Sequence, residues 1–138
     1  RIMIDNQWAF DLETNVFSII KKKALAILED NYPDISITTD EESNDKPVFP
    51  TILIQSVEPT ETNSDLEADR INTVDFTAQV TVTTNRSRSE ALQVSNVIAD
   101  LYKKRLFKIK PMPFVRKEGN LWTATFRAKR KFGWNDIL

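Results

Sequence analysis

The sequence INTVDFTAQVTVTT, at residues 71–84, is the clearest structural signal in the chain. Apolar residues occupy every second position from Val74 to Val82, and threonine, glutamine and aspartate occupy the positions between them. Such strict alternation predicts a long β-strand with one face on a core and the other face in water. The Thr-rich wet face suits an exposed or interface-forming sheet.

Before this strand, the sequence predicts one helix. Residues 11–29 repeat apolar residues at intervals of three and four, which is typical of an amphipathic helix. Asp11 is the expected N-cap, and Tyr32–Pro33 ends the helix because the residue before proline avoids helical backbone.

Two strands are expected between this helix and the long strand. Residues 35–39 alternate apolar and polar types, and apolar residues on both sides of 51–58 indicate a strand inside the sheet. The polar, acidic segments 40–46 and 59–69 lack periodicity and are predicted to be loops.

After the long strand, the sequence predicts a second helix and two more strands. Ser87 or Ser89 caps the helix, which reaches about Lys104. A strand over 107–115 contains two prolines and is therefore expected at an edge or with a bulge. A turn then leads to a last strand over 121–131.

These elements follow in the order α-β-β-β-α-β-β, in which helices and strands do not strictly alternate. The order predicts an α+β fold, namely a mostly antiparallel sheet with both helices on one face. A length of 138 residues suits one domain. We therefore expect a single domain over 1–138, with residues 1–9 and 133–138 as terminal extensions.

Missing residue types exclude several kinds of active site. The chain has no Cys and no His, which excludes disulfides, thiolate nucleophiles, Ser–His–Asp triads and histidine metal sites. Its two glycines cannot build a phosphate-binding loop. A Ser–Lys dyad stays open, although nothing in the sequence marks one. We therefore expect a protein that is not an enzyme and needs no cofactor.

Hydropathy gives no sign of a membrane protein. No apolar run approaches the length of about 20 residues that a membrane-spanning helix needs, and no signal peptide opens the chain. We therefore expect a soluble intracellular protein with no membrane partner.

The formal net charge of −1 conceals an uneven distribution. Residues 1–80 contain 16 acids and 6 bases, whereas residues 81–138 contain 4 acids and 13 bases, giving −10 and +9. Two oppositely charged faces would steer copies of the chain into head-to-tail contact. Alternatively, the two halves interleave in one fold and their charges mix on its surface.

An acidic cluster at Asp40, Glu41, Glu42 and Asp45 has two interpretations. Its carboxylates suit a hard cation such as Mg²⁺ or Ca²⁺, which would support a metal-dependent hydrolase. The glycine and the distal glutamate of a calcium-binding hand are missing, so a solvated loop is the favoured interpretation.

Basic residues in the C-terminal half suggest a nucleic-acid-binding module as an alternative function. Arg86, Arg88, Arg127 and Lys129 would contact phosphates, while nearby aromatic side chains such as Phe126 would stack on bases. The strand period instead places Phe126 in the core and leaves Arg127 and Lys129 on the solvent face, which is the favoured interpretation.

Several stretches, in order, resemble one family. They are NYPDI (31–35), PVFPTILIQ (47–55), NTVDFTAQVTVTTN (72–85), SRSEALQVSNVIADLY (87–102), and a hairpin with Pro111, Pro113 and Gly119 that ends in ATFRAKRKF (124–132). In element order and spacing the chain resembles small phage tail-terminator and tail-completion proteins, which join head to tail. A baseplate subunit, a tube initiator, or the terminator of a headless tail-like particle would share this pattern.

The resemblance implies a structural virion protein of the phage tail, assembled in the host cytoplasm. Such proteins form rings, usually hexamers, that stop growth of the tail tube and offer a docking face to the head. The implied partners are further copies of the chain, the tail-tube protein and a head-completion or connector protein. The family implies no cofactor, no catalysis and no specific nucleic acid, although DNA passes through the ring.

A ring requires a head-to-tail interface. Opposite charges and terminal aromatic residues are suited to form such an interface. Trp134, near the C-terminus, either folds back on the core or anchors a neighbour. The candidate residues for contacts between subunits or with the tube are Asp40, Glu41, Glu42, Arg86, Arg88, Arg127, Lys129 and Trp134.

Overall fold

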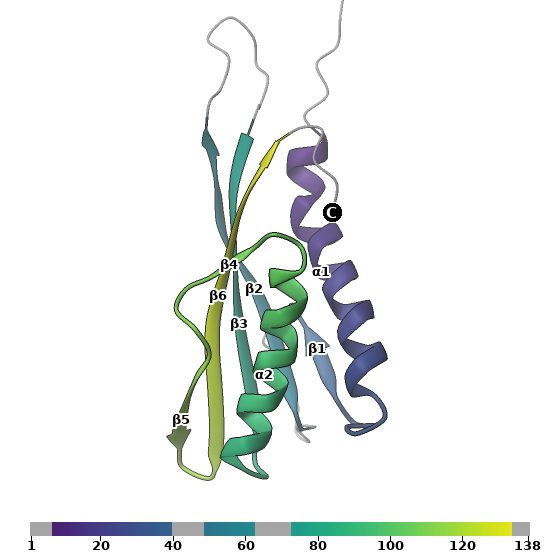
Figure 1. The fold of residues 1–138 in the computed structure, drawn as a ribbon, viewed down its shortest axis with the longest axis vertical. Coiled ribbons are helices and arrows are strands. Elements are labelled where there is room, and N and C mark those ends of the chain that lie inside the picture. The colour runs from purple at the N-terminus through teal and green to yellow at the C-terminus, as the bar shows by residue number, and fades with distance from the viewer. Residues whose placement is uncertain (1–6, 40–48, 63–72, 134–138) are drawn as a thin grey trace, which may run out of the picture.

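The structure is a computed structural model that describes residues 7–39, 49–62 and 73–133 (Figure 1). Two helices and a six-stranded sheet account for most of these residues. In chain order they are α1 (Gln7–Leu28), β1 (Ser36–Thr38), β2 (Thr51–Thr62), β3 (Thr73–Thr84), α2 (Arg88–Lys103), β4 (Lys108–Ile109), β5 (Phe114–Glu118) and β6 (Leu121–Gly133).

The sheet confirms the predicted α+β class. Its strand order is β1-β2-β3-β6-β4, and β5 pairs with β6 along the same edge as β4. Only the pair of β1 and β2 is parallel among the described strands. The single edge strand expected over 107–115 is divided into β4 and β5. Pro111 and Pro113 lie in the gap between them, and neither has an N–H for the ladder.

Strand β3 lies in the middle of the sheet, and its alternating side chains show that the two faces of the sheet differ in burial. It pairs along its length with β2 on one side and with β6 on the other. The even-numbered residues from Val74 to Thr84 are buried, and the odd-numbered ones are half-buried. Because β2 and most of β3 belong to the acidic half of the chain and β6 to the basic half, the two halves interleave in one sheet.

Both helices cover the face that these buried side chains form (Figure 1). Helix α2 begins after Ser87, whose hydroxyl oxygen accepts a hydrogen bond from the Glu90 N–H at 3.1 Å. Ser87 rather than Ser89 is therefore the N-cap. Its buried residues include Ala91, Val94 and Ile98, as the apolar spacing predicts.

Two predicted boundaries were wrong. Helix α1 begins at Gln7, so Asp11 lies inside the helix and does not cap it; no Gly or Pro between them interrupts the helix. Strand β2 continues through Pro59 to Thr62, where a loop was expected. The register of β2 against β3 shifts between Val57 and Thr60, and such a bulge accommodates a proline in a strand. Residues 40–48 and 63–72, which hold the rest of the predicted loops, lie outside the described residues.

The core is richest in aromatic rings near the end of α2. Tyr102, Phe126 and Phe132 are almost completely buried. Tyr102 contacts Phe107 and Phe126, and Phe132 contacts Phe76 and Phe107, all edge to face at centroid distances of 5.0–6.3 Å. The Tyr102 hydroxyl has no hydrogen-bond partner among the described residues. Burial raises the pKa of this hydroxyl well above its usual value, because the phenolate would lose its hydration.

Candidate functional site

The face of the sheet opposite the helices has no covering layer among the described residues. Along its centre, Leu53, Thr81 and Thr125 lie side by side on β2, β3 and β6, and the same row ends at Phe114 on β5. These side chains are half-buried or exposed, whereas their neighbours one position along each strand face the core. We call this surface the open face.

Cations concentrate on the open face along β6. Arg127 and Lys129 are exposed on alternate positions, and Lys131 follows them two residues later. Arg127 Nε donates a hydrogen bond to Gln79 Oε1 at 3.1 Å, and Lys131 Nζ lies 4.0 Å from Asp75 Oδ1. The half of this face that borders β4 is therefore cationic, whereas the half over β2 and β3 is mainly neutral.

A groove of about 670 Å³ lies beside this cationic row. Strand β4 pairs with only two residues of β6, and beyond Lys129 no other described strand pairs with β6 on that side. We call this groove the β4–β6 groove. Its polar and apolar lining includes Asp75, Leu106, Lys108, Lys129, Arg130 and Lys131.

The charges in the β4–β6 groove are not balanced. Lys108 and Lys129 are opposite each other in the register of β4 and β6, and both are exposed. Like charges in that arrangement destabilise a sheet. In the described ranges the ion pairs are Arg86–Glu90 and Lys131–Asp75, so neither of these two lysines has a carboxylate partner there.

Arg130 has a structural role at the floor of the groove. Its Nη1 donates a hydrogen bond of 2.8 Å to the Arg105 carbonyl oxygen, and its guanidinium lies 4.2 Å from the centre of the Phe132 ring. These contacts attach the connection between α2 and β4 to the sheet. The cations open to a partner are therefore the lysines rather than Arg130.

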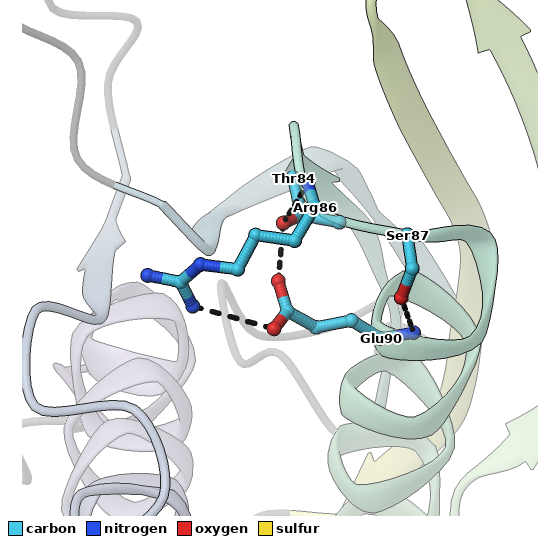
Figure 2. A network of polar contacts seen from close by, with 4 residues as sticks. All are labelled: Thr84, Arg86, Ser87 and Glu90. Atoms are coloured by element: carbon cyan, nitrogen blue, oxygen red, sulfur yellow. Dashed lines mark hydrogen bonds and ion pairs between the residues drawn. The ribbon is translucent and has the colours of Figure 1, made fainter.

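Arg86 takes part in a compact polar network at the opposite end of β3 (Figure 2). Its Nη1 lies 3.3 Å from Glu90 Oε1, and its N–H donates to Thr84 Oγ1 at 3.3 Å. Thr84 Oγ1 in turn donates to Glu90 Oε2. With the cap from Ser87, this network fixes the turn from β3 into α2, so Arg86 has a partner within its own chain.

The structure divides the predicted interface residues between two places. Arg127 and Lys129 share the open face, whereas Arg86 and exposed Arg88 lie at the turn into α2. Gln79, opposite Arg127, is five residues from the end of β3, which corresponds to about 17 Å. The other predicted residues, Asp40, Glu41, Glu42 and Trp134, lie outside the described residues.

The aromatic side chains near the basic residues are largely unavailable for base stacking. Phe126 is in the core, as the strand period predicts, and Phe132, one residue beyond the predicted strand, is in the core as well. Trp122 is half-buried, and Lys117 Nζ lies 5.2 Å from the centre of its ring. The cationic row thus has few exposed rings beside it, which weakens the nucleic-acid interpretation.

Two residues of the groove were missed from the sequence, namely Leu106 and Lys108. The alternation of residues 107–115 marks Lys108 as a strand residue, but its position opposite Lys129 depends on the register. Leu106 follows a helix end where glycine is the usual residue, so the sequence contains no signal for its left-handed backbone.

The described residues contain no group of three or more carboxylates that could hold a metal ion. The acidic cluster around Asp40 is not among them. Neither described helix is long and apolar enough to cross a membrane.

No protein-family model matches the sequence, and no curated protein matches it closely enough to indicate a relationship. The functional argument therefore depends on the fold and on the open face.

Proposed function

We propose that this chain is a structural subunit that forms a ring, expected to be a hexamer, at the end of a phage tail or tail-like particle. The ring would terminate growth of the tail tube and provide the surface that joins tail to head. In this role the chain performs no catalysis and acts through contacts with its own copies, the tube and the head connector.

The observation that carries the proposal is that the two faces of the sheet differ in how they are covered. One face is covered by both helices, and the other is left open over β2, β3 and β6 by the residues that the structure describes (Figure 1). A subunit of a closed ring needs two different surfaces that meet head to tail. An uncovered sheet face with a cationic border supplies one such surface without disturbing the core.

The long strands support the same role. Strands β2 and β3 each have 12 residues and extend well beyond α2 in Figure 1. At about 3.3 Å per residue, each spans roughly 40 Å. Strands of this length let one subunit reach a neighbour while its core stays compact.

The experiment is native mass spectrometry and electron microscopy of the full chain, alone and mixed with purified tail tubes of the virus or prophage that encodes it. We expect closed rings, or rings that form only on tube ends, with one ring per tube end. A chain that stays monomeric at high concentration and also fails to bind tube ends would overturn the proposal.

A further inference from the structure

Two edges of the sheet have no neighbouring strand among the described residues. Strand β1 is outermost on one side, and β5, which pairs with β6, is outermost on the other. The two edges lie on opposite sides of the sheet (Figure 1). Four strand spacings of about 4.8 Å separate them, so they cannot meet within one copy. Such edges present backbone groups that can pair with another chain.

The outer edge of β5 presents the backbone groups of Val115 and Lys117. A two-residue turn joins β5 to β6, and Glu118 pairs with Leu121 across it. Gly119 opens this turn with a φ of 60°, which glycine adopts without strain. The residues that close such a turn are hydrogen-bonded to each other, and bonded pairs alternate along an antiparallel ladder. Every second residue back from Glu118 therefore bonds β6, whereas Val115 and Lys117 direct their N–H and C=O groups outward.

The outer edge of β1 presents the backbone groups of Ile37. The Ser36 N–H donates to the Pro50 carbonyl oxygen at 3.1 Å, so the backbone groups of Ser36 face β2. In a parallel pair the next residue faces the other way, which directs the N–H and C=O of Ile37 outward. The side chain of Ile37 is buried in the core and fixes the orientation of this short strand.

The strand registers place these outward groups at the same height of the sheet. One row across the strands contains, in order, Ile37, Ile52, Val82, Ala124 and Val115. A second copy placed beside the first in the same orientation would therefore bring its Ile37 opposite Val115. Strands β1 and β5 run in opposite directions, so the new pair would be antiparallel. Two residues that direct both backbone groups at each other form the hydrogen-bonded pair of such a ladder.

The chain next to the two edges has opposite charge. Residues 24–39, which lead into and include β1, contain three acids and no base, namely Glu29, Asp30 and Asp34, and all three are exposed. Residues 103–118, which end with β5, contain seven bases and one acid. None of these charges belongs to an ion pair within the described ranges. Electrostatic complementarity therefore favours contact between unlike edges of two copies over contact between like edges.

We propose that β1 of one copy pairs with β5 of a second copy and joins their two sheets into one. Ile37 and Val115 exchange N–H···O=C bonds, and Thr38 lies beside Phe114, whose side chain is 40 % exposed in the single chain. Each copy contributes two different edges, so the contact is head to tail and can repeat around a ring. This inference rests on the proposed function, because it supplies the contact between neighbours in the ring.

A disulfide trap in the full chain tests the register of this contact. The chain has no cysteine, so Thr38→Cys combined with Phe114→Cys can form disulfides only between the introduced residues. The proposed pairing makes these two positions a non-hydrogen-bonded pair with Cα atoms about 4.5 Å apart, which suits a disulfide. The matched control, Thr38→Cys combined with Glu118→Cys, moves one cysteine about 13 Å along β5.

Mild oxidation followed by non-reducing electrophoresis measures the covalently linked copies. The measurement is made on the free chain over a range of concentrations and on chain bound to tail-tube ends. We expect at least about tenfold more linked product from the Thr38 and Phe114 pair than from its control, because only the first pair meets the distance limit for a disulfide.

Val115→Pro tests the backbone bonds of the contact. The substitution removes the outward N–H, which β6 does not use, so the sheet of the monomer is retained. Val115→Ala keeps the N–H and also loses apolar contact, which makes it the matched control. By sedimentation velocity, Val115→Pro should associate at least about tenfold more weakly than the wild type, and Val115→Ala within about threefold. If the wild type assembles only on tubes, the fraction of capped tube ends replaces sedimentation. Circular dichroism shows whether each variant is folded.

Either of two results would overturn the inference. One is linked product from the Thr38 and Phe114 pair that does not exceed its control, both in the free chain and on tube ends. The other is a folded Val115→Pro variant that assembles as well as Val115→Ala. Rings that still form in these cases would leave the proposed function standing. Conversely, linked copies that never close into rings or cap tubes would support this contact and overturn the proposed function.

Discussion

The two faces of one sheet differ in what they specify. On the covered face, Val80, Phe126 and Ala128 are buried to 0 % exposure, and their shapes must fit those of the helices. On the open face, Thr81, Arg127 and Lys129 are one position away along the same strands and remain in contact with solvent. Adjacent residues are therefore under different constraints, namely packing on one face and contact with solvent on the other, because side chains alternate across a strand.

This difference teaches where stability and recognition lie in the molecule. The covered face contains almost all the buried apolar area, which dominates the free energy of folding. The open face and the β4–β6 groove contain unbalanced charge and an exposed leucine, neither of which stabilises the monomer. Substitutions on the two sides should therefore change the free energy of unfolding by different amounts and with opposite signs.

The largest effect is expected from Phe126→Ala on the covered face. Removing a fully buried phenylalanine should lower the free energy of unfolding by about 3–5 kcal/mol. Its control, Thr125→Ala on the open face of the same strand, should change it by less than about 0.5 kcal/mol. Urea unfolding measures both variants, and equal losses would contradict the assignment of the two faces.

We expect Tyr102, on the covered face, to lower the free energy of unfolding at alkaline pH. Burial raises the pKa of the folded-state hydroxyl, so above about pH 10 only the unfolded state releases this proton. Stability from this group is complete below that pH and falls by roughly 1.4 kcal/mol for each further pH unit. Tyr102→Phe should remove this loss.

The measurement for Tyr102 is urea unfolding of wild type and Tyr102→Phe between pH 8 and pH 11.5. At pH 8 the free energy of unfolding of the variant should equal or exceed that of the wild type, because the variant removes a buried hydroxyl that has no partner in the described part of the chain. A variant that weakens with pH as steeply as the wild type would show that the hydroxyl is hydrated in the folded protein.

Periodicity made the covered face predictable, whereas the open face depends on register. The alternation of Val74 to Val82 and the spacing of Ala91, Val94 and Ile98 were enough to identify the core and the α+β class. The start of α1 was not, because no breaker marks the residues before Asp11. Helix ends are weakly encoded where neither a cap nor a proline stands.

The candidate site could be predicted only in part, for the same reason. Arg127 and Lys129 follow from the alternation of β6, so their exposure was expected. The position of Lys108 opposite Lys129 depends on pairing between strands far apart in sequence, and Leu106 departs from the glycine preference of helix ends. Local sequence patterns cannot predict either the strand register or the left-handed backbone of Leu106.

On the groove side, Leu106→Gly should stabilise the monomer. A left-handed conformation costs a residue with a side chain about 1–2 kcal/mol, and the greater freedom of glycine in the unfolded state offsets about half of that. We expect a net gain of about 0.5–1 kcal/mol in urea unfolding. Leu106→Ala, which shortens the side chain but keeps the strain, should gain nothing, and an equal gain from alanine would contradict the strain.

The smallest expected effect is from Lys108→Glu in the same groove. It replaces a like-charge pair with Lys129 by an opposite-charge pair, which should raise the free energy of unfolding by about 0.2–1 kcal/mol. Lys108→Gln should give part of this gain, and Lys22→Glu on α1 should give little or none. High salt should reduce the gain, because exposed charges are screened.

Lys108→Glu also gives the sharpest contrast between the two sides of the sheet. On the covered face, a substitution that destabilises the monomer also weakens any assembly built from it. In the groove, Lys108→Glu should stabilise the monomer, so a loss of self-association in this variant would identify Lys108 as a contact residue between copies. Unfolding is measured on dilute monomer and association by sedimentation. If both quantities rise together, Lys108 has no partner and its charge is incidental.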